Sequence, residues 1–510
     1  MKHYDAVVIG SGVGGLAAGA VLAKNGLNVA VLEKNHCPGG VANSFRRGRF
    51  EFEISLHELC GFGPPENPVG SSRRVLDALG LSDRIEWARV PEAYRLITFA
   101  EDSPIDAVMP FGTRAFADAL ESYAPGSRGP AEKAFALAGE IRRALSDLGR
   151  ASGPEEKRAC LLSHPDFLRA AGLSVDEGLR QLGMPERGAD IMKGYWAYLF
   201  TDCSELSFLH YLNMVNSYIE LGSVIPKNRS LELTNAFAGY IRERGGDVLT
   251  DSEVTRIMCE GGAVRGVRTR SGAEYAADGV VCNISPLSVY SLLLEEGDVT
   301  AFDRKKTNAR ELSGRGFCVY LGLDRSAREL GLENYSYFIY PDMDTASQYR
   351  SAGSTATNLI QNTVCQNAAD EEASPPGTCI LTMTTLFSSD VWGGVAPEDY
   401  HAEKDAFAAR MISVFEKATG ISISHHIEEM EVAAPQTFAR YIGSPEGAIY
   451  GYKAASWDSI LARKLMDGKD SDIRGLYFAG GFGMNLNGYS SAMSSGMDAA
   501  ERLLGRRDAR

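Results

Sequence analysis

A glycine loop between two apolar runs near the N-terminus constrains the fold more than any other feature of this sequence. Residues 5–10 read Asp-Ala-Val-Val-Ile-Gly, typical of a buried strand, and the loop continues as Gly10-Ser11-Gly12-Val13-Gly14-Gly15. A helical pattern from Leu16 to about Asn25 follows, and then a second apolar run, Val29–Leu32, which ends at Glu33. This order predicts a βαβ dinucleotide-binding unit, and hence an α/β fold with a parallel sheet.

Each glycine of this loop has a physical task. Gly10 allows the tight turn, Gly12 lets a pyrophosphate approach the backbone, and Gly15 lets the helix pack closely on the strand. The helix N-terminus offers free N–H groups to phosphate. Glu33 lies 33 − 15 = 18 residues after Gly15, where a carboxylate binds ribose hydroxyls and disfavours a 2′-phosphate, which leaves FAD or NAD. The predicted cofactor-binding residues of this unit are Gly10, Gly12, Val13, Gly14, Gly15, Glu33 and Lys34.

A second glycine pair, Gly39-Gly40, favours FAD over NAD as the predicted cofactor. It follows the ribose acid and leads into the strand pattern Phe50-Glu51-Phe52-Glu53. This arrangement resembles flavoproteins of the glutathione-reductase type, in which FAD lies extended across the domain. Many of them carry an Arg after the glycine pair, whereas this chain has Val41. The resemblance implies that Gly39 and Gly40 contact FAD; the alternative is a simple turn.

Two later stretches read as further pieces of the same domain. Residues 237–250 begin as an amphipathic helix, and short strands separated by glycine turns follow to about residue 283. Residues 475–481 form a buried strand that runs into a glycine turn, and a closing helix continues to Leu504. We therefore predict a discontinuous, Rossmann-like FAD-binding domain with an inserted α+β substrate-binding domain. The predicted FAD-binding segments are 1–75, 225–290 and 470–510, and the predicted substrate-binding segments are 76–224 and 291–469.

Taken together, these residues resemble the FAD-dependent phytoene desaturase, carotenoid isomerase and retinol saturase group. The first 60 residues, residues 224–286, and the stretches 435–451 and 476–510 carry the resemblance. Gly480-Gly481 stands where the group often has Gly-Asp after its last strand. Further FAD contacts implied by the resemblance are Val254, Gly480, Gly481, Asn487 and Met493.

The same resemblance implies an enzyme that acts on carbon–carbon double bonds of an apolar polyene or unsaturated lipid, such as a carotenoid or retinoid. Desaturation, saturation and isomerisation all remain open, and the electron donor or acceptor is unidentified. The candidate catalytic residues, chosen because they can exchange a proton near the flavin ring, are His57, Glu58, Tyr450 and Glu446. We also expect a deep apolar tunnel between the FAD domain and the insertions.

Two other functions share this fold. A flavin amine oxidase needs a polar entrance and an aromatic cage beside the ring, and the loop 480–488 offers no obvious aromatic residue apart from Phe482, which counts against this function. A lipid-binding protein that resembles GTPase dissociation inhibitors binds isoprenoid without flavin, and the intact glycine loop and Glu33 disfavour it.

The amino-acid composition limits which partners the protein can bind. The net charge of 52 − 66 = −14 disfavours binding to nucleic acid. The nine cysteines are scattered without a C-x-x-C pair, so we predict neither a disulfide framework nor a metal site, and expect a cytoplasmic protein. No apolar run reaches the roughly 20 residues of a membrane span. The apolar stripe over Leu137–Leu148 is most simply core, with peripheral membrane contact as its alternative, and the sequence does not indicate an oligomeric state.

Overall fold

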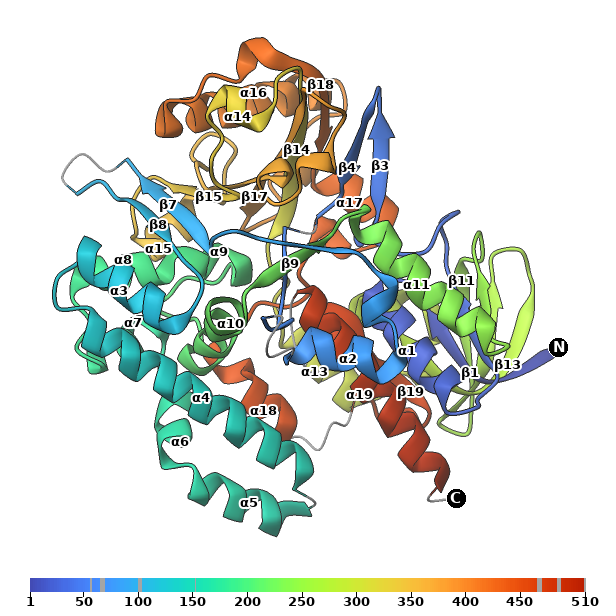
Figure 1. Cartoon of the computed structure of the whole chain (residues 1–510). Coiled ribbons are helices and arrows are strands. Elements are labelled where there is room, and N and C mark those ends of the chain that lie inside the picture. The colour runs from blue at the N-terminus through green and yellow to red at the C-terminus, as the bar shows by residue number, and fades with distance from the viewer. Residues whose placement is uncertain are drawn as a thin grey trace.

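A computed structural model describes residues 1–55, 57–64, 69–99, 103–151, 153–465, 470–483 and 488–508. Figure 1 shows one β-sheet at the right, a second at the top, and a group of helices, α3 to α8, at the lower left. Helices α1, α2, α10, α11 and α19 lie between these three parts.

The first sheet is the predicted α/β sheet. Its strands follow the order β10-β2-β1-β13-β12-β11, and β19 also pairs with β13. Strands β1, β2, β10, β13 and β19 run parallel, whereas β11, β12 and β13 form antiparallel pairs. The strands span Lys2–Ile9 (β1), Val29–Leu32 (β2), Asp247–Leu249 (β10), Val254–Glu260 (β11), Ala263–Thr269 (β12), Glu274–Cys282 (β13) and Leu476–Phe478 (β19).

Three helices cover one face of this sheet: α1 (Val13–Lys24), α11 (Arg229–Glu243) and α19 (Tyr489–Asp508). Helix α1 begins at Val13, three residues before the predicted start, because Gly12 serves as its N-cap. Helices α1 and α19 pack closely, since a Cβ on Gly496 would lie 2.0 Å from the Gly14 carbonyl oxygen. The glycine loop and the last helix thus form one packed unit.

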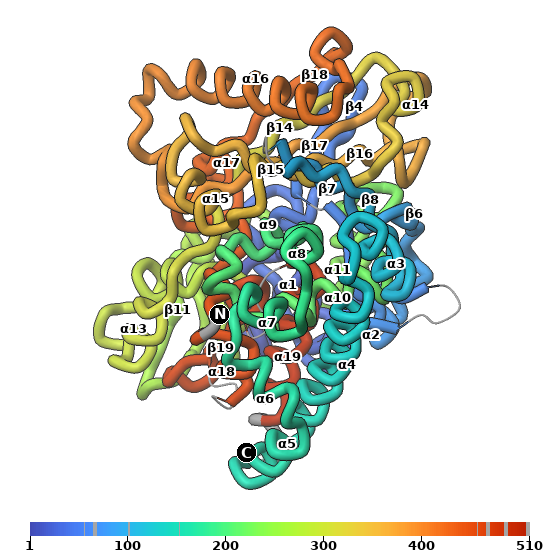
Figure 2. Tube along the Cα trace, turned by 90° about the vertical axis from the view of Figure 1, so that its left-hand side faces the viewer, coloured from blue at the N-terminus to red at the C-terminus, as the bar shows by residue number. Residues whose placement is uncertain are grey.

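The second sheet belongs to the insertions. Its order is β18-β14-β17-β16-β15-β7-β8, antiparallel except for the pair β15–β7. Helix α16 (Tyr400–Thr419) packs on it through Phe407, Met411 and Phe415, and crosses the top of Figure 2. The strands span Tyr94–Thr98 (β7), Asp106–Met109 (β8), Arg315–Leu323 (β14), Ser336–Tyr340 (β15), Gln361–Cys365 (β16), Cys379–Phe387 (β17) and Ile427–Ala433 (β18).

Short strands and helices connect the two sheets. The strands span Ser44–Arg47 (β3), Phe50–Glu53 (β4), Leu59–Cys60 (β5), Trp87–Arg89 (β6) and Ser223–Pro226 (β9). The helices span Ser71–Leu79 (α2), Thr113–Tyr123 (α3), Arg128–Arg150 (α4), Gly153–Ser163 (α5), Pro165–Ala171 (α6), Val175–Gln181 (α7), Glu186–Met192 (α8), Trp196–Leu199 (α9), Phe208–Leu221 (α10), Pro286–Ser288 (α12), Ala301–Asn308 (α13), Ala327–Leu330 (α14), Thr345–Ser351 (α15), Pro435–Ile442 (α17) and Ile460–Leu465 (α18).

The apolar stripe of α4 is core, as its spacing predicts. Ile141, Ala144 and Leu148 are buried, whereas Leu145 is only partly buried. Among the described residues, none of the helices combines the length and apolar character that a bilayer span requires.

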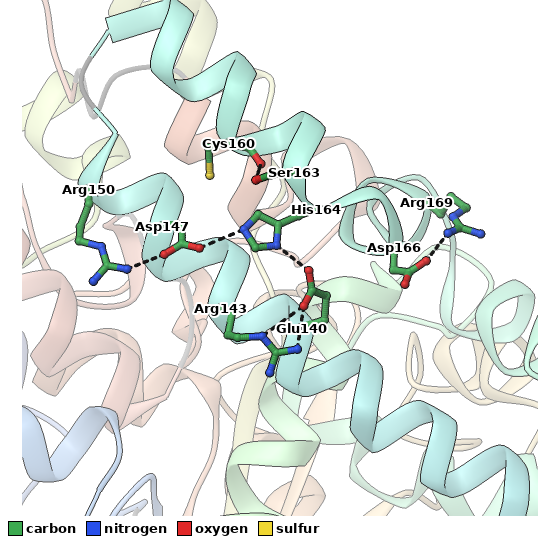
Figure 3. A network of polar contacts seen from close by, with 9 residues as sticks. All are labelled: Glu140, Arg143, Asp147, Arg150, Cys160, Ser163, His164, Asp166 and Arg169. Atoms are coloured by element: carbon green, nitrogen blue, oxygen red, sulfur yellow. Dashed lines mark hydrogen bonds and ion pairs between the residues drawn. The ribbon is translucent and has the colours of Figure 1, made fainter.

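A histidine clamp fastens α5 and α6 to α4 (Figure 3). The ring of His164 lies between two carboxylates, with Nδ1 2.5 Å from Glu140 Oε1 and Nε2 3.0 Å from Asp147 Oδ2. The outer sides of these acids pair with Arg143 and Arg150. The hydrogen bond with Glu140, reinforced by Asp147, raises the pKa of His164. Helix α5 has no fully buried side chain, and partly buried Leu161 packs against the core cluster that includes α4.

Candidate active site

A cavity of about 350 Å³ lies at the carboxyl ends of the parallel strands β1, β2, β13 and β19, where this class of fold binds dinucleotides. The sequence-predicted residues that line it are Gly10, Gly12, Val13, Gly14, Glu33, Lys34, Gly39, Gly40, Val254, Gly480 and Gly481. Three segments that are far apart in the sequence therefore meet at this cavity.

The glycines allow a close approach of neighbouring segments at the edge of the cavity. A Cβ on Gly14 would lie 2.7 Å from the backbone nitrogen of Gly480, and one on Gly12 would lie 2.7 Å from Asn283 Nδ2. No side chain caps the N-terminus of α1, so its first N–H groups are available to a ligand. A narrow, glycine-walled space beside a free helix N-terminus fits a pyrophosphate.

Glu33 is an acidic residue in the wall of the cavity, at the end of β2. Its side chain is buried, with one carboxyl oxygen accepting hydrogen bonds from the Ser11 backbone N–H at 2.9 Å and hydroxyl at 2.6 Å. The other oxygen accepts one from the Asn35 N–H at 2.9 Å. These bonds fix the carboxylate at the end of β2, where it fits a pair of ribose hydroxyls and repels a 2′-phosphate.

The second glycine pair continues the cradle. Gly39 and Gly40 have φ values of 129° and 60°, which disfavour residues with a side chain, and the Gly39 N–H donates to the Ser11 carbonyl at 3.0 Å. Lys34 Nζ donates to the Arg440 carbonyl at 2.8 Å and so ties the loop after β2 to the end of α17. The described geometry therefore gives Lys34 a role in shaping the cavity wall.

Of the predicted cofactor residues that the structure describes, Gly15 and Met493 do not line this cavity. Gly15 packs against the Gly10 carbonyl, and a Cβ there would lie 2.1 Å from that oxygen. Met493 is fully buried in the core between α1 and α19, and Ala492 and Tyr489 of the same helix line the cavity instead. Asn487 lies outside the described residues.

Several residues that line this cavity were not found from the sequence, among them Leu292 and Tyr441. Leu292 and Tyr441 line the same space, although their side chains are 72% and 58% exposed. Exposed apolar side chains beside a cavity indicate a surface that a ligand covers. They come from two separate segments, and no spacing in the sequence marks them.

A second, larger cavity of about 1200 Å³ opens toward the first. Helices α2 and α19 line one side, and α4, α10 and α18 line the other. Both cavities include Ser55, His57, Tyr450, Gly488 and Tyr489 in their walls. The two spaces therefore meet at these residues, which is where a substrate would reach a cofactor.

His57 lies at this junction as a neutral ring. It is 9% exposed, and burial lowers its pKa to about 4. Its Nε2 atom lies 3.1 Å from Thr384 Oγ1. At neutral pH it can donate or accept one hydrogen bond, but it carries no charge.

Glu58, the next residue, is also uncharged at neutral pH, but it is uncharged because its carboxyl keeps a proton that it can donate. Burial raises the pKa of its carboxyl to about 8, against the smaller opposing effect of the Tyr198 hydroxyl, which donates to Oε1 at 3.1 Å. The other oxygen, Oε2, is buried without a hydrogen-bond partner in the described structure. Glu58 lines the larger cavity and is protonated at neutral pH, so it can act as an acid there.

Of the two remaining catalytic candidates, Tyr450 lies at the junction of the two cavities and Glu446 does not. Tyr450 lines both cavities, and burial raises its pKa, which keeps the hydroxyl protonated. Glu446, which the sequence suggested as a catalytic residue, is not part of this site. It lines neither cavity and forms an ion pair with Arg315. Its side chain is 41% exposed, and its backbone φ of 55° turns the chain so that residues 447–450 face inward without it.

The lining of the larger cavity differs from the apolar tunnel expected from the sequence. Its position between the two sets of elements is as predicted. However, Ser217, Ser490 and Ser494 line it together with Tyr198 and Tyr218, and charged side chains surround its outer part. Its aromatic wall includes Tyr198 from the aromatic stretch 195–212, most of which forms core.

Comparison with known proteins agrees with this geometry. The sequence profile of the flavin-containing amine oxidoreductases matches residues 13–504. An oxidoreductase from Methanosarcina mazei has the same fold, with a TM-score of 0.66 at 18% identity over 98% of this chain and 100% of that one.

Two curated relatives extend over nearly the whole chain. An all-trans-retinol 13,14-reductase from Danio rerio is 25% identical over 99% of this chain and 86% of its own length. A chloroplastic prolycopene isomerase from Daucus carota is 23% identical over 98% of this chain and 80% of its own length. These relatives confirm the resemblance to the isomerase and saturase group. The chain belongs to the flavin-containing amine oxidoreductase family, and its cofactor is FAD.

Proposed function

We propose that this chain is an FAD-dependent enzyme that reduces or isomerises carbon–carbon double bonds of an unsaturated lipid of the retinoid or carotenoid type. The observation that carries the proposal is the junction at His57 and Tyr450, where a cavity of about 1200 Å³ meets the cofactor cavity. By their names, the two curated relatives act on retinol and on prolycopene, which are both polyenes.

The residues at the junction suit proton transfer to carbon. Bound FAD supplies hydride chemistry to such a site. Saturation of a double bond consumes one hydride and one proton, and the neutral Glu58 carboxyl is the proton source beside the junction. Tyr198 holds this carboxyl through Oε1 and leaves Oε2 without a hydrogen-bond partner among the described residues. His57 and Tyr450 orient the substrate and exclude water.

We also propose which segments of the chain bind the substrate and which bind FAD. Residues 76–224 and 291–469, which include α4, α10 and α18, would hold the substrate, and the remaining segments would hold FAD. Net saturation or desaturation also requires an external electron partner, whereas isomerisation does not. A lipid substrate would reach the cavity from a membrane surface or a carrier, which supports peripheral membrane contact.

Amine oxidation is the less favoured alternative, although it is the activity that gives the family its name. The larger cavity is lined by five Arg and Lys side chains and three ionised acids, and an excess of positive charge repels a protonated amine. A flavin-free lipid carrier is unsupported because the cofactor cradle is complete in the described residues.

The test is to reduce the FAD-loaded protein without oxygen and then add all-trans-retinol or a cis-carotenoid. Return of the oxidised flavin spectrum together with a saturated product would support saturation. A changed double-bond geometry with the flavin still reduced would support isomerisation. Oxidation of putrescine with no reaction of either polyene would overturn the proposal in favour of amine oxidation.

A further inference from the structure

The outer part of the larger cavity concentrates positive charge. Five cationic side chains from three helices line it, against three ionised acids, so the described lining carries 5 − 3 = +2 on a chain of net charge −14. Glu58 and His210 also line it but are neutral near pH 7, because burial raises the pKa of Glu58 to about 8 and lowers that of His210 to about 4. The cations are Arg73, Arg74, Arg142, Arg150 and Lys464, and the acids are Asp77, Glu220 and Asp498.

These cations retain donors for a ligand. Arg142 pairs with Glu220 at 2.8 Å and Arg73 with Asp77 at 2.8 Å, and each guanidinium has five N–H groups, more than one carboxylate can accept. No carboxylate of the described residues lies within ion-pair distance of Arg74 or Lys464. These two side chains, from α2 and α18, therefore line the cavity without a direct ion pair among the described residues.

The same cavity continues from these cations to the junction with the cofactor site. Its inner wall includes Tyr198, Tyr218 and Tyr450, whose rings suit an unsaturated chain. One elongated molecule could place a double bond at His57 and its other end among the cations. A volume of about 1200 Å³ exceeds the roughly 300–1,000 Å³ of ordinary small-molecule sites.

We propose that the substrate is an unsaturated lipid carboxylate, whose head group binds among Arg74, Arg142 and Lys464 while its chain reaches the junction at His57 and Tyr450. This rests on the proposed function and narrows it, because a hydrocarbon carotenoid has nothing to pair with these side chains. The head group is a monoanion, matched to the small net charge of the lining.

Equilibrium binding of all-trans-retinoic acid and all-trans-retinol to the FAD-loaded protein, followed by quenching of protein fluorescence, tests the proposal. The test variant is the double charge reversal Arg74→Glu/Lys464→Glu, which breaks no direct ion pair of the described residues. The matched control is Arg114→Glu/Lys133→Glu, which makes the same change of charge at exposed sites on α3 and α4 outside both cavities.

We expect the test variant to lose about tenfold or more affinity for retinoate relative to retinol, and the control to change this ratio less than about twofold. Added salt should weaken retinoate binding to the unaltered protein more than retinol binding. An equal loss for both ligands, or an equal loss of retinoate in both double variants, would overturn the proposal.

Retention of the flavin spectrum in both variants establishes folding, and Arg74→Gln/Lys464→Gln should show a smaller loss in the same direction. Since binding is measured without turnover, a head-group effect without any reaction of a double bond would contradict the proposed function alone. A reaction of retinol without a head-group effect would contradict only the present proposal.

Discussion

The Tyr198 hydroxyl donates to one oxygen of Glu58 at 3.1 Å, while the other oxygen of that buried carboxyl has no partner among the described residues. An unsatisfied carboxyl oxygen in a buried position is costly, and such cost commonly persists at functional sites. The two residues therefore form a positioned acid beside the place where the two cavities meet.

Replacement of Glu58 by Gln should remove the acid with little change of shape. We expect kcat for a polyene substrate to fall by about 10²–10⁴ with KM nearly unchanged, the usual range for a lost general acid. In the unaltered protein, activity should decline as the pH rises through about 8, because Glu58 then loses its proton. The pH profile of the variant should lack this decline; a decline at the same pH in both proteins would exclude Glu58 as its source.

Replacement of Tyr198 by Phe should move the same limb of the pH profile. The hydroxyl bond favours the ionised form of Glu58 and lowers its pKa, so its loss should shift the decline of activity to higher pH. Tyr218→Phe is the matched control, since Tyr218 lines the same cavity and its ring lies 5.7 Å from that of Tyr198. Pre-steady-state rates from pH 6 to about 10 measure the shift, and a shift toward lower pH would contradict the assignment.

Replacement of Gly14 by Ala should weaken FAD binding. The new Cβ would lie 2.7 Å from the backbone nitrogen and Cα of Gly480, so the glycine loop and the turn after β19 would have to separate. We expect at least about a tenfold rise in Kd for FAD, which corresponds to ~1.4 kcal/mol. Gly239→Ala on α11 meets nothing within 4 Å and should keep full affinity. Titration of the apoprotein followed by flavin fluorescence compares the two.

Replacement of His164 by Gln should change how stability depends on pH. The folded-state pKa of His164 is raised above 6.5, so its stabilising effect is complete below about pH 6.5 and is lost as the pH rises through the folded value. The free energy of urea unfolding should therefore fall with the variant mainly at low pH, and the two proteins should converge at higher pH. His401→Gln, whose ring contacts Tyr400, serves as the control. A constant difference at all pH values would argue against the clamp.

The cofactor site was largely predictable from sequence because its determinants are local. Gly10, Gly12 and Gly14 follow one strand directly, and Glu33 ends the next, so spacing alone places them at one sheet edge. Met493 was misplaced by one residue, since a helix turns about 100° per residue and Ala492 faces the cavity instead.

The substrate site could not be predicted in the same way. Tyr198 meets Glu58 across 140 residues, and Arg315 removes Glu446 from the site across 131 residues. The cations of the larger cavity come from α2, α4 and α18, and each reads in the sequence as an ordinary surface residue. These charged side chains line one cavity only because the three helices pack together in the folded protein.

The packing of Gly496 against the Gly14 carbonyl also has a consequence for biosynthesis. The glycine loop is synthesised before Gly480 and α19, which complete the cradle. Closing so long a loop is slow, and the half-built cradle has no wall opposite α1 in the meantime. The complete cradle for FAD can therefore form only after α19 has been synthesised.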